Sequence, residues 1–439
     1  MKAPPNLPKG EELGAKYYKM NPSSKGWLKQ YIQEYYLNED LINIFHCKNE
    51  KLDNEKFLYR ITQPTGLIYG YPSQFFLVNT SKMGEWNDKE KFKLIITESF
   101  LNYSLCFECQ NILDYNKITN NLDQIIKNIA DFYKVIFPKT SYSSATKDNY
   151  EFVEKVIDKR INVKYKLTGN FWTSMFQNNL IFLDLAYFSR YINENYITSI
   201  EEREETKLLI IKIIAAAAHS SYSIEKEEKR MFEYFLHSAH LSPENIKLVK
   251  EYFKNGIKLE DIEHNEVSSW IIRKFCLEIA ILTIWSDRMV TEDEKDFIAD
   301  LSNKLNFNEI EMESSMIAIE SFVLNNADKV FYLGNKQNYQ VLSKSLTSKL
   351  TKMVKKNKSM IAQEISESKE LVELLAKSRN QKLSAEEKKK VKGQLFDILR
   401  TIPSFAIFMV PGGSILLPIL LKIIPENIMK PSSFINPKN

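Results

Sequence analysis

IIAAAAHSSYSIEKEEKRMFEYF, from Ile213 to Phe235, and IAILTIWSDRMVTEDEKDFIADL, from Ile279 to Leu301, are two copies of one pattern. In each copy an apolar helix leads through a short turn into a charged helix start. The copies belong to longer segments, Lys212–Leu241 and Glu278–Phe307, that align at a constant offset. Thr291 is a capable N-cap, and the acidic residues after it favour the positive end of a helix. The pattern predicts a pair of helical hairpins in the middle of the chain.

The composition favours helices in the rest of the chain as well. The 439 residues include 12 glycines, and they are rich in Lys, Glu, Ile, Leu and Asn without long alternating runs. We therefore expect a mainly α, multi-domain protein, although Phe57–Thr62 and Phe75–Val78 are short apolar runs that could form strands. The net charge of +4 is too small to indicate DNA as a partner.

We expect three parts along the chain. Residues 1–147 form a mostly helical N-terminal domain, which a polar linker at Ser141–Asn149 separates from the next part. Residues 150–328 contain the hairpin repeats. Residues 334–439 form a C-terminal region with a basic amphipathic helix and an apolar segment at about 402–424.

The apolar segment includes TIPSFAIFMVPGGSILLPILL, from Thr401 to Leu421, which carries no charge. About 20 apolar residues is the length that a helix needs to cross a ~30 Å hydrocarbon core. Prolines and glycines interrupt the run, and the backbone groups that they free need partners. The segment is therefore predicted to be a kinked span, a re-entrant hairpin or a hairpin packed against protein. Its candidate membrane residues are Pro403, Phe405, Phe408, Pro411, Gly412, Gly413, Ser414, Leu417, Pro418, Lys422 and Pro425.

A basic helix precedes this segment. Leu342, Leu346, Leu350 and Met353 form one apolar stripe, and lysines surround it. This pattern is typical of a helix that lies on an anionic membrane surface, and a solvated lysine face on a soluble protein has the same pattern. The candidate surface lysines here and in a second cluster are Lys344, Lys349, Lys352, Lys355, Lys356, Lys358, Lys388, Lys389, Lys390 and Lys392. Because both clusters lie before the apolar run, the positive-inside rule keeps the bulk of the chain in the cytoplasm.

The C-terminal region resembles the leucine-zipper/EF-hand-containing transmembrane (LETM) family, which is best known from the mitochondrial inner membrane. The resemblance covers roughly Leu342 to Phe434, under a quarter of the chain. Its approach to the membrane segment is SKELVELLAKSRNQKLSAEEKKKVKGQLFDILRTIPSF, from Ser368 to Phe405. Its further motif positions are Ile402, Pro403, Phe405, Phe408, Val410, Pro411, Leu416, Leu417, Pro418, Lys422, Pro425 and Pro431-Ser432-Ser433-Phe434.

The chain departs from that family in three ways. The family's large, ribosome-binding-like helical domain follows the membrane segment, and this chain stops at Asn439. Ser414 stands where members often carry a carboxylate, the natural carrier of a proton or cation in a membrane. No D-x-D-x-D-G loop with a closing Glu occurs, so an EF-hand is not expected.

The repeats resemble the tellurite-resistance TerB-like fold, in which pairs of such units pack into a small helical bundle. That family carries an Asp-Gly pair in the turn and a Glu in the next helix. The second copy keeps Asp287 and Glu294, whereas the first keeps Glu228 and has Ser221 in place of the Asp. Asp287 and Glu294 are candidate ligands for a divalent cation, and the competing interpretation is that the acidic residues stabilise the helix start.

Other groups of chemically reactive residues carry weaker signals. Cys106 and Cys109 form a C-x-x-C pair that His46-Cys47 could complete as a zinc site, but the usual second pair is missing. His237 and His240 are three residues apart without the H-E-x-x-H order. The sequence contains no phosphate-binding loop, nucleophile elbow or kinase motif, and it therefore indicates a protein that is not an enzyme and has no cofactor beyond a possible divalent cation.

Together, the TerB-like middle and the LETM-like C-terminal region look like a bacterial group associated with biofilms. That resemblance implies a place at the cytoplasmic membrane and a role in cation homeostasis or membrane-protein biogenesis, with lipids and the ribosome or another protein as partners. One alternative is a soluble cytoplasmic stress-response scaffold with a cation-sensing TerB-like module. Another is an oligomeric cation/proton exchanger. The N-terminus MKAPPNLPKGEELG carries neither a secretory signal nor a transit peptide.

Overall fold

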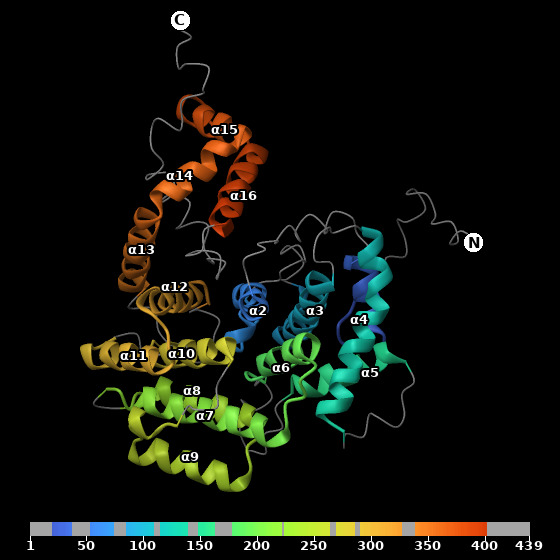
Figure 1. The fold of residues 1–439 in the computed structure, drawn as a ribbon, viewed down its shortest axis with the longest axis vertical. Coiled ribbons are helices and arrows are strands. Elements are labelled where there is room, and N and C mark those ends of the chain that lie inside the picture. Colours follow the sequence, from blue (N-terminus) through green and yellow to red (C-terminus); the bar gives the residue numbers. More distant parts are fainter. Residues whose placement is uncertain are drawn as a thin grey trace, which may run out of the picture.

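The computed structural model describes residues 20–36, 53–73, 85–108, 115–138, 148–162, 178–221, 224–263, 269–285, 290–326 and 339–401. These residues are mainly helical and contain no strand, which confirms the predicted fold class (Figure 1). The first helices are α1 (Trp27–Tyr31), which continues into a π-helix (Ile32–Tyr36), α2 (Asn54–Thr62), α3 (Asp88–Glu108), α4 (Tyr115–Ile136) and α5 (Asn149–Arg160). The middle holds α6 (Phe182–Glu194), α7 (Ile200–Ala218), α8 (Lys226–Ala239), α9 (Pro243–Asn255), α10 (Trp270–Ile284), α11 (Glu292–Lys304) and α12 (Glu309–Asn326).

The short apolar run Phe57–Thr62 is helical, so its interpretation as a strand is wrong. It belongs to α2, whose N-cap Asp53 accepts a hydrogen bond from the backbone N–H of Lys56 at 2.8 Å. An aspartate at this position satisfies a free N–H of the first helical turn. The helix then buries Leu58 and Tyr59 against α3, α6 and α10. The second ambiguous run, Phe75–Val78, and most of the predicted linker lie outside the described residues.

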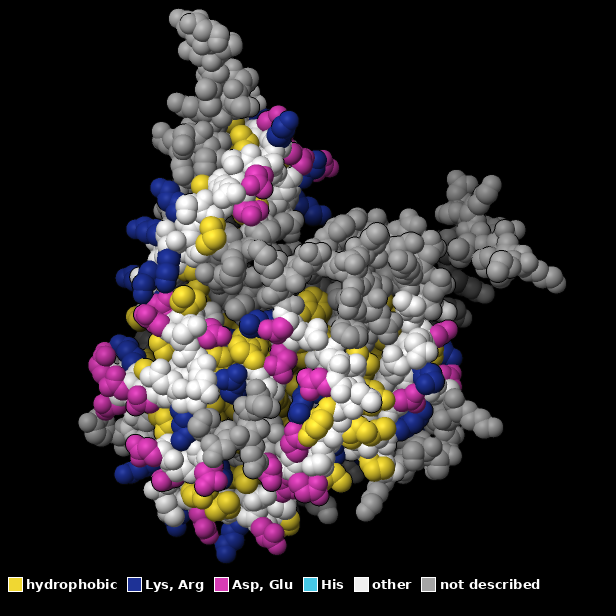
Figure 2. All heavy atoms as spheres, viewed as in Figure 1, with side chains coloured by type: hydrophobic (Ala, Val, Ile, Leu, Met, Phe, Trp, Pro, Cys, Tyr) yellow, Lys and Arg dark blue, Asp and Glu magenta, His cyan; other side chains and the backbone are white. Residues whose placement is uncertain are grey.

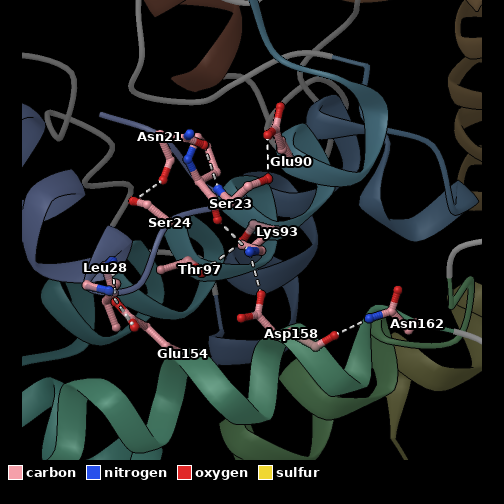
Figure 3. Close-up of polar contacts among 12 residues, drawn as sticks. Asn21, Ser23, Ser24, Leu28, Glu90, Lys93, Thr97, Glu154, Asp158 and Asn162 are labelled. Carbon is pink, nitrogen blue, oxygen red and sulfur yellow. Dashed lines mark hydrogen bonds and ion pairs between the residues drawn. The ribbon is translucent and has the colours of Figure 1, made fainter. Parts of the chain in front are cut away.

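A side chain from a distant helix caps the start of α1 (Figure 3). The local N-cap is Gly26, which has no side chain to offer. Instead, the Glu154 carboxylate of α5 accepts the backbone N–H groups of Leu28 at 2.8 Å and Gly26 at 3.0 Å. Beside it, Lys93 of α3 donates to the Pro22 carbonyl at 2.5 Å and pairs with Asp158 of α5. These contacts fasten the first described segment to the face between α3 and α5.

The repeated pattern forms two helical hairpins, as predicted. The apolar halves are α7 and α10, which pack side by side, and each is followed by its charged partner, α8 or α11. Both charged helices begin with the same capping interaction. Glu294 accepts the backbone N–H of Thr291 at 2.7 Å, and Glu228 accepts that of Glu225 at 2.8 Å. Side chains three residues into a helix that bond back to the N-cap form a capping box, and this box occupies equivalent places in the two copies.

The last four helices that the structure describes form an arm, which extends away from the helices before it, here called the body (Figure 1). They are α13 (Tyr339–Lys356), α14 (Lys358–Glu367), α15 (Lys369–Asn380) and α16 (Ala385–Thr401). The first of them packs on α12 of the body, and the other three pack on one another. Their contacts bury apolar side chains of every helix, among them Ile361, Ile365, Leu371, Leu375, Val391 and Leu395. The arm therefore has its own small core, which α13 joins to the body.

Candidate membrane-contact arm

The apolar stripe of α13 faces the body of the protein. Leu342, Leu346, Leu350 and Met353 are all buried, and α12 is the helix that covers them. A helix that lies on a membrane inserts its apolar face among the lipids. Because α12 already occupies this stripe, the part of α13 that is free for other contacts is its lysine-bearing face.

That face is strongly basic. From Tyr339 to Gln363 the chain contains six lysines and no acidic residue. Lys349 and Lys352 form ion pairs with Glu320 and Glu313 of α12. The remaining four are exposed, and none of them has an ion pair with the residues that the structure describes: Lys344, Lys355, Lys356 and Lys358. Figure 2 shows Lys and Arg side chains along the outer edge of the arm, over α13 and α14.

A buried carboxylate anchors the basic helix to the body. Glu320 of α12 is fully buried, and it accepts hydrogen bonds from Lys349 and, at 3.2 Å, from the Ser345 hydroxyl, both on α13. Burial raises the pKa of Glu320, and the neighbouring Lys349 opposes that rise. A half-exposed pair would contribute little, but a buried charge needs its partner. This contact therefore holds the orientation of α13 on α12.

The second lysine cluster lies on α16. Lys388, Lys389 and Lys390 are exposed, and Lys392 belongs to the same helix. Lys390 pairs with Glu370 of α15 at 2.9 Å, and Gln394 donates to the same carboxylate at 2.6 Å. The cluster is therefore partly used to hold α15 and α16 together.

The apolar segment that follows lies outside the described residues, and so do all its candidate membrane residues from Pro403 to Pro425. Among the helices that are described, none is long and apolar enough to cross a membrane. Thr401, the last residue of the arm that the structure describes, is also the residue at which the uncharged run begins in the sequence.

Glu294, one of the two candidate cation ligands, has a structural role at the start of α11. Glu294 is buried, and its Oε2 atom also accepts the Thr291 hydroxyl at 3.1 Å. Its proposed partner ligand Asp287 lies outside the described residues. No group of three or more His, Cys, Asp or Glu side chains in the described part of the chain is placed to hold a metal ion.

The two candidate histidines of α8 have different settings, and most of the candidate zinc ligands lie outside the described residues. His237 pairs with Glu233 on its own helix at 3.3 Å, whereas His240 ends α8 in a left-handed conformation with φ 50°. Cys106 belongs to α3, and Cys109, His46 and Cys47 lie outside the described residues.

Sequence reasoning missed the acidic partners Glu313 and Glu320. They come from a helix that precedes α13 by a stretch of undescribed chain, so no short spacing links them to their lysines. Comparison with protein-family models, with curated proteins and with solved structures gives no significant match. The LETM and TerB resemblances therefore remain predictions from the sequence.

Proposed function

We propose that this protein is a non-enzymatic, membrane-associated helical scaffold. In this proposal, the arm of α13–α16 meets an anionic membrane surface through its free lysines, and the apolar segment at about 402–424 inserts nearby. The helical body then stays in the cytoplasm of a bacterium and is available to a protein or ribosomal partner. The resemblance to the LETM family suggests cation homeostasis or membrane-protein biogenesis as the setting.

The observation that carries this proposal is the charge pattern of the arm. Four lysines that have no ion pair within the described part of the chain project from α13 and the start of α14, and in the sequence the uncharged run follows α16. Near an anionic surface each lysine contributes on the order of 1 kcal/mol, and the attraction falls off within a Debye length of about 10 Å. A basic patch next to an inserting segment supplies the two signals that stable attachment generally requires.

Vesicle binding of the full-length protein tests the electrostatic part. We expect co-sedimentation with vesicles of phosphatidylcholine and phosphatidylserine, weaker binding to phosphatidylcholine alone, and a loss of the difference in high salt. Replacing Lys344, Lys355, Lys356 and Lys358 with Gln should remove the preference for the anionic lipid. The matched control replaces Lys247, Lys250, Lys254 and Lys258, four exposed lysines at and just after α9 at the opposite end of the molecule, and should bind as the parent does (Figure 1).

Fractionation tests the apolar segment. The full chain should resist a carbonate wash of the membranes, and a chain ending at Arg400 should be released. If both chains are soluble without membranes, the segment is packed against protein and the soluble scaffold replaces this proposal. Equal loss of vesicle binding in the arm and control variants would show that net charge, rather than the arm, determines the attraction.

A further inference from the structure

Two arginines from different helices share one aromatic ring, that of Phe137. Arg160 ends α5, and Arg203 lies on α7. Their guanidinium carbons lie 4.8 Å and 5.5 Å from the centre of the Phe137 ring. Guanidinium groups favour such positions over aromatic rings, and the ring here brings two like charges close together.

The two arginines have different sets of acceptors. Arg203 donates to two backbone carbonyls, those of Thr198 at 2.6 Å and Ile136 at 2.8 Å. Arg160 donates through Nε and one terminal nitrogen to both oxygens of Asp184, at 2.7 Å and 2.6 Å. The second terminal nitrogen of Arg160 has no acceptor among the described residues. A guanidinium has five donors in a fixed fork, so Arg160 can serve another oxyanion while it keeps Asp184.

Two further basic residues lie near these arginines: Lys207 follows Arg203 on α7, and His240 is two residues before Ser242, whose backbone N–H donates to Glu204 of α7. Lys207 lies one turn after Arg203 on α7, is mostly buried, and makes no hydrogen bond or ion pair with the described residues. Burial lowers the pKa of Lys207 to about 8, and repulsion from Arg160 adds to this effect. His240 ends α8 and keeps an exposed surface, and partial burial together with Arg160 and Lys207 lowers its pKa to about 4. The surroundings of both groups therefore disfavour their charged forms.

The nearby carboxylates are already used by other donors. Asp184 also accepts the Tyr133 hydroxyl at 3.2 Å in addition to Arg160. Glu204, one turn before Lys207, accepts the backbone N–H of Ser242 at 2.9 Å and the side-chain amide of Asn245 at 2.7 Å. Asp184 and Glu204 are the carboxylates that act on Lys207, and neither makes a hydrogen bond to its ammonium group.

We infer that Arg160, Lys207 and His240 form a binding site for a small oxyanion of the phosphate type, which the exposed edge of His240 leaves open to solvent. An arginine with a free donor and an unpaired lysine are the groups that proteins use for such anions. The bound anion would neutralise Lys207 and favour the protonated form of His240. This inference does not depend on membrane association, because no residue of the arm takes part.

Titration of the full-length protein with sodium phosphate tests the site, with sodium chloride at equal ionic strength as the reference. We expect phosphate to raise the melting temperature and chloride to leave it unchanged. Lys207→Met should weaken phosphate binding about tenfold or more, whereas Lys207→Arg should retain most of it. Lys212→Met, on the same helix, is the matched control and should bind phosphate as the parent does.

A second measurement tests whether phosphate binds next to both His240 and Lys207. In the parent protein, phosphate should raise the pKa of His240 measured by NMR, and in Lys207→Met this rise should be smaller. Repeating the titration with glycerol phosphate separates a site for free phosphate from one for a phosphate ester, such as a lipid headgroup. The inference is overturned if phosphate has no effect beyond chloride, or if Lys207→Met and Lys212→Met bind phosphate equally well.

Discussion

The Tyr59 hydroxyl of α2 donates to the Glu278 carboxylate of α10 at 2.5 Å, in the interior of the protein. Tyr69 donates to the other oxygen of the same carboxylate at 2.9 Å. Lys274, one turn before Glu278, lies 3.8 Å from it and donates to the Ser314 hydroxyl at 2.9 Å. A buried carboxylate is stable only with such partners. Lys274 and Glu278, the charged pair on α10, therefore connect this helix to α2 of the N-terminal part and to α12.

Tyr59→Phe tests this connection. Removing the hydroxyl leaves one oxygen of Glu278 without its tyrosine donor, and the free energy of unfolding should fall by about 1–3 kcal/mol. Urea unfolding with an unchanged m-value would measure this loss. Tyr71→Phe is the control, because Tyr71 is half-buried and its hydroxyl makes no hydrogen bond with the described residues. A similar loss in both variants would contradict a special role for the Tyr59 contact.

Local features of the fold could be predicted from the sequence, whereas long-range partners could not. The helix start at Thr291 and the apolar stripe of Leu342 and Leu346 follow from spacings of three or four residues. The hydrogen bond between Tyr59 and Glu278 connects residues far apart in the chain, and no sequence spacing predicts it. Phe57–Thr62 is ambiguous in the sequence because an apolar run of this length fits either a strand or a helix. In the structure, the N-cap Asp53 stabilises the start of the helix that contains this run.

The capping box of α11 gives a second prediction. Thr291→Ala removes the hydroxyl that accepts the Glu294 N–H at 3.3 Å, and it should cost about 1 kcal/mol of stability. Thr291→Ser keeps the hydroxyl and should stay close to the parent protein. Thermal unfolding of the parent and the two variants would measure their order of stability. If the serine variant were as unstable as the alanine variant, the methyl group and not the cap would account for the loss.

The anchor of the arm gives a third prediction. Lys349→Met leaves the buried Glu320 carboxylate with only the Ser345 hydroxyl, which should cost on the order of 3 kcal/mol near neutral pH. The pKa of Glu320 is raised in the folded protein, so the folded state binds the proton more tightly than the unfolded state does. Stability from this group is therefore greatest below its unfolded pKa and is lost as pH rises. The penalty of Lys349→Met should shrink as pH falls toward about 4.5.

Urea unfolding across this pH range, with hydrogen exchange of α13, would measure the effect. Lys352→Met is the matched control, because the Lys352 pair with Glu313 has a lysine side chain that is 68% exposed. Screening by solvent makes such pairs weak, so this variant should change little at any pH. A pH-independent penalty in Lys349→Met would mean that packing of the lysine stem, and not its charge, stabilises the contact.

The candidate sites show the same division between local and distant signals. The lysines of α13 were visible in the sequence because they repeat within one helix. The cations Arg160, Lys207 and His240 were not grouped, because three different helices bring them together. Their unusual electrostatic setting arises only when folding buries Lys207 beside Arg160.

The burial of Lys207 gives a last prediction, which concerns the protein without bound phosphate. The pKa of Lys207 falls to about 8 in the folded state, while an unfolded lysine titrates near 10.4. Between these values the unfolded state binds more protons, so the contribution of Lys207 makes the protein more stable as pH rises. In buffers without phosphate, Lys207→Met should therefore be more stable than the parent by about 1–3 kcal/mol at pH 7, and the difference should narrow toward pH 10. Phosphate should bind the parent more tightly than Lys207→Met. Adding phosphate at pH 7 should therefore stabilise the parent more and narrow the difference in stability between the two proteins. A Lys207→Met variant that is less stable than the parent at pH 7 would show that the ammonium group has a partner in the folded protein.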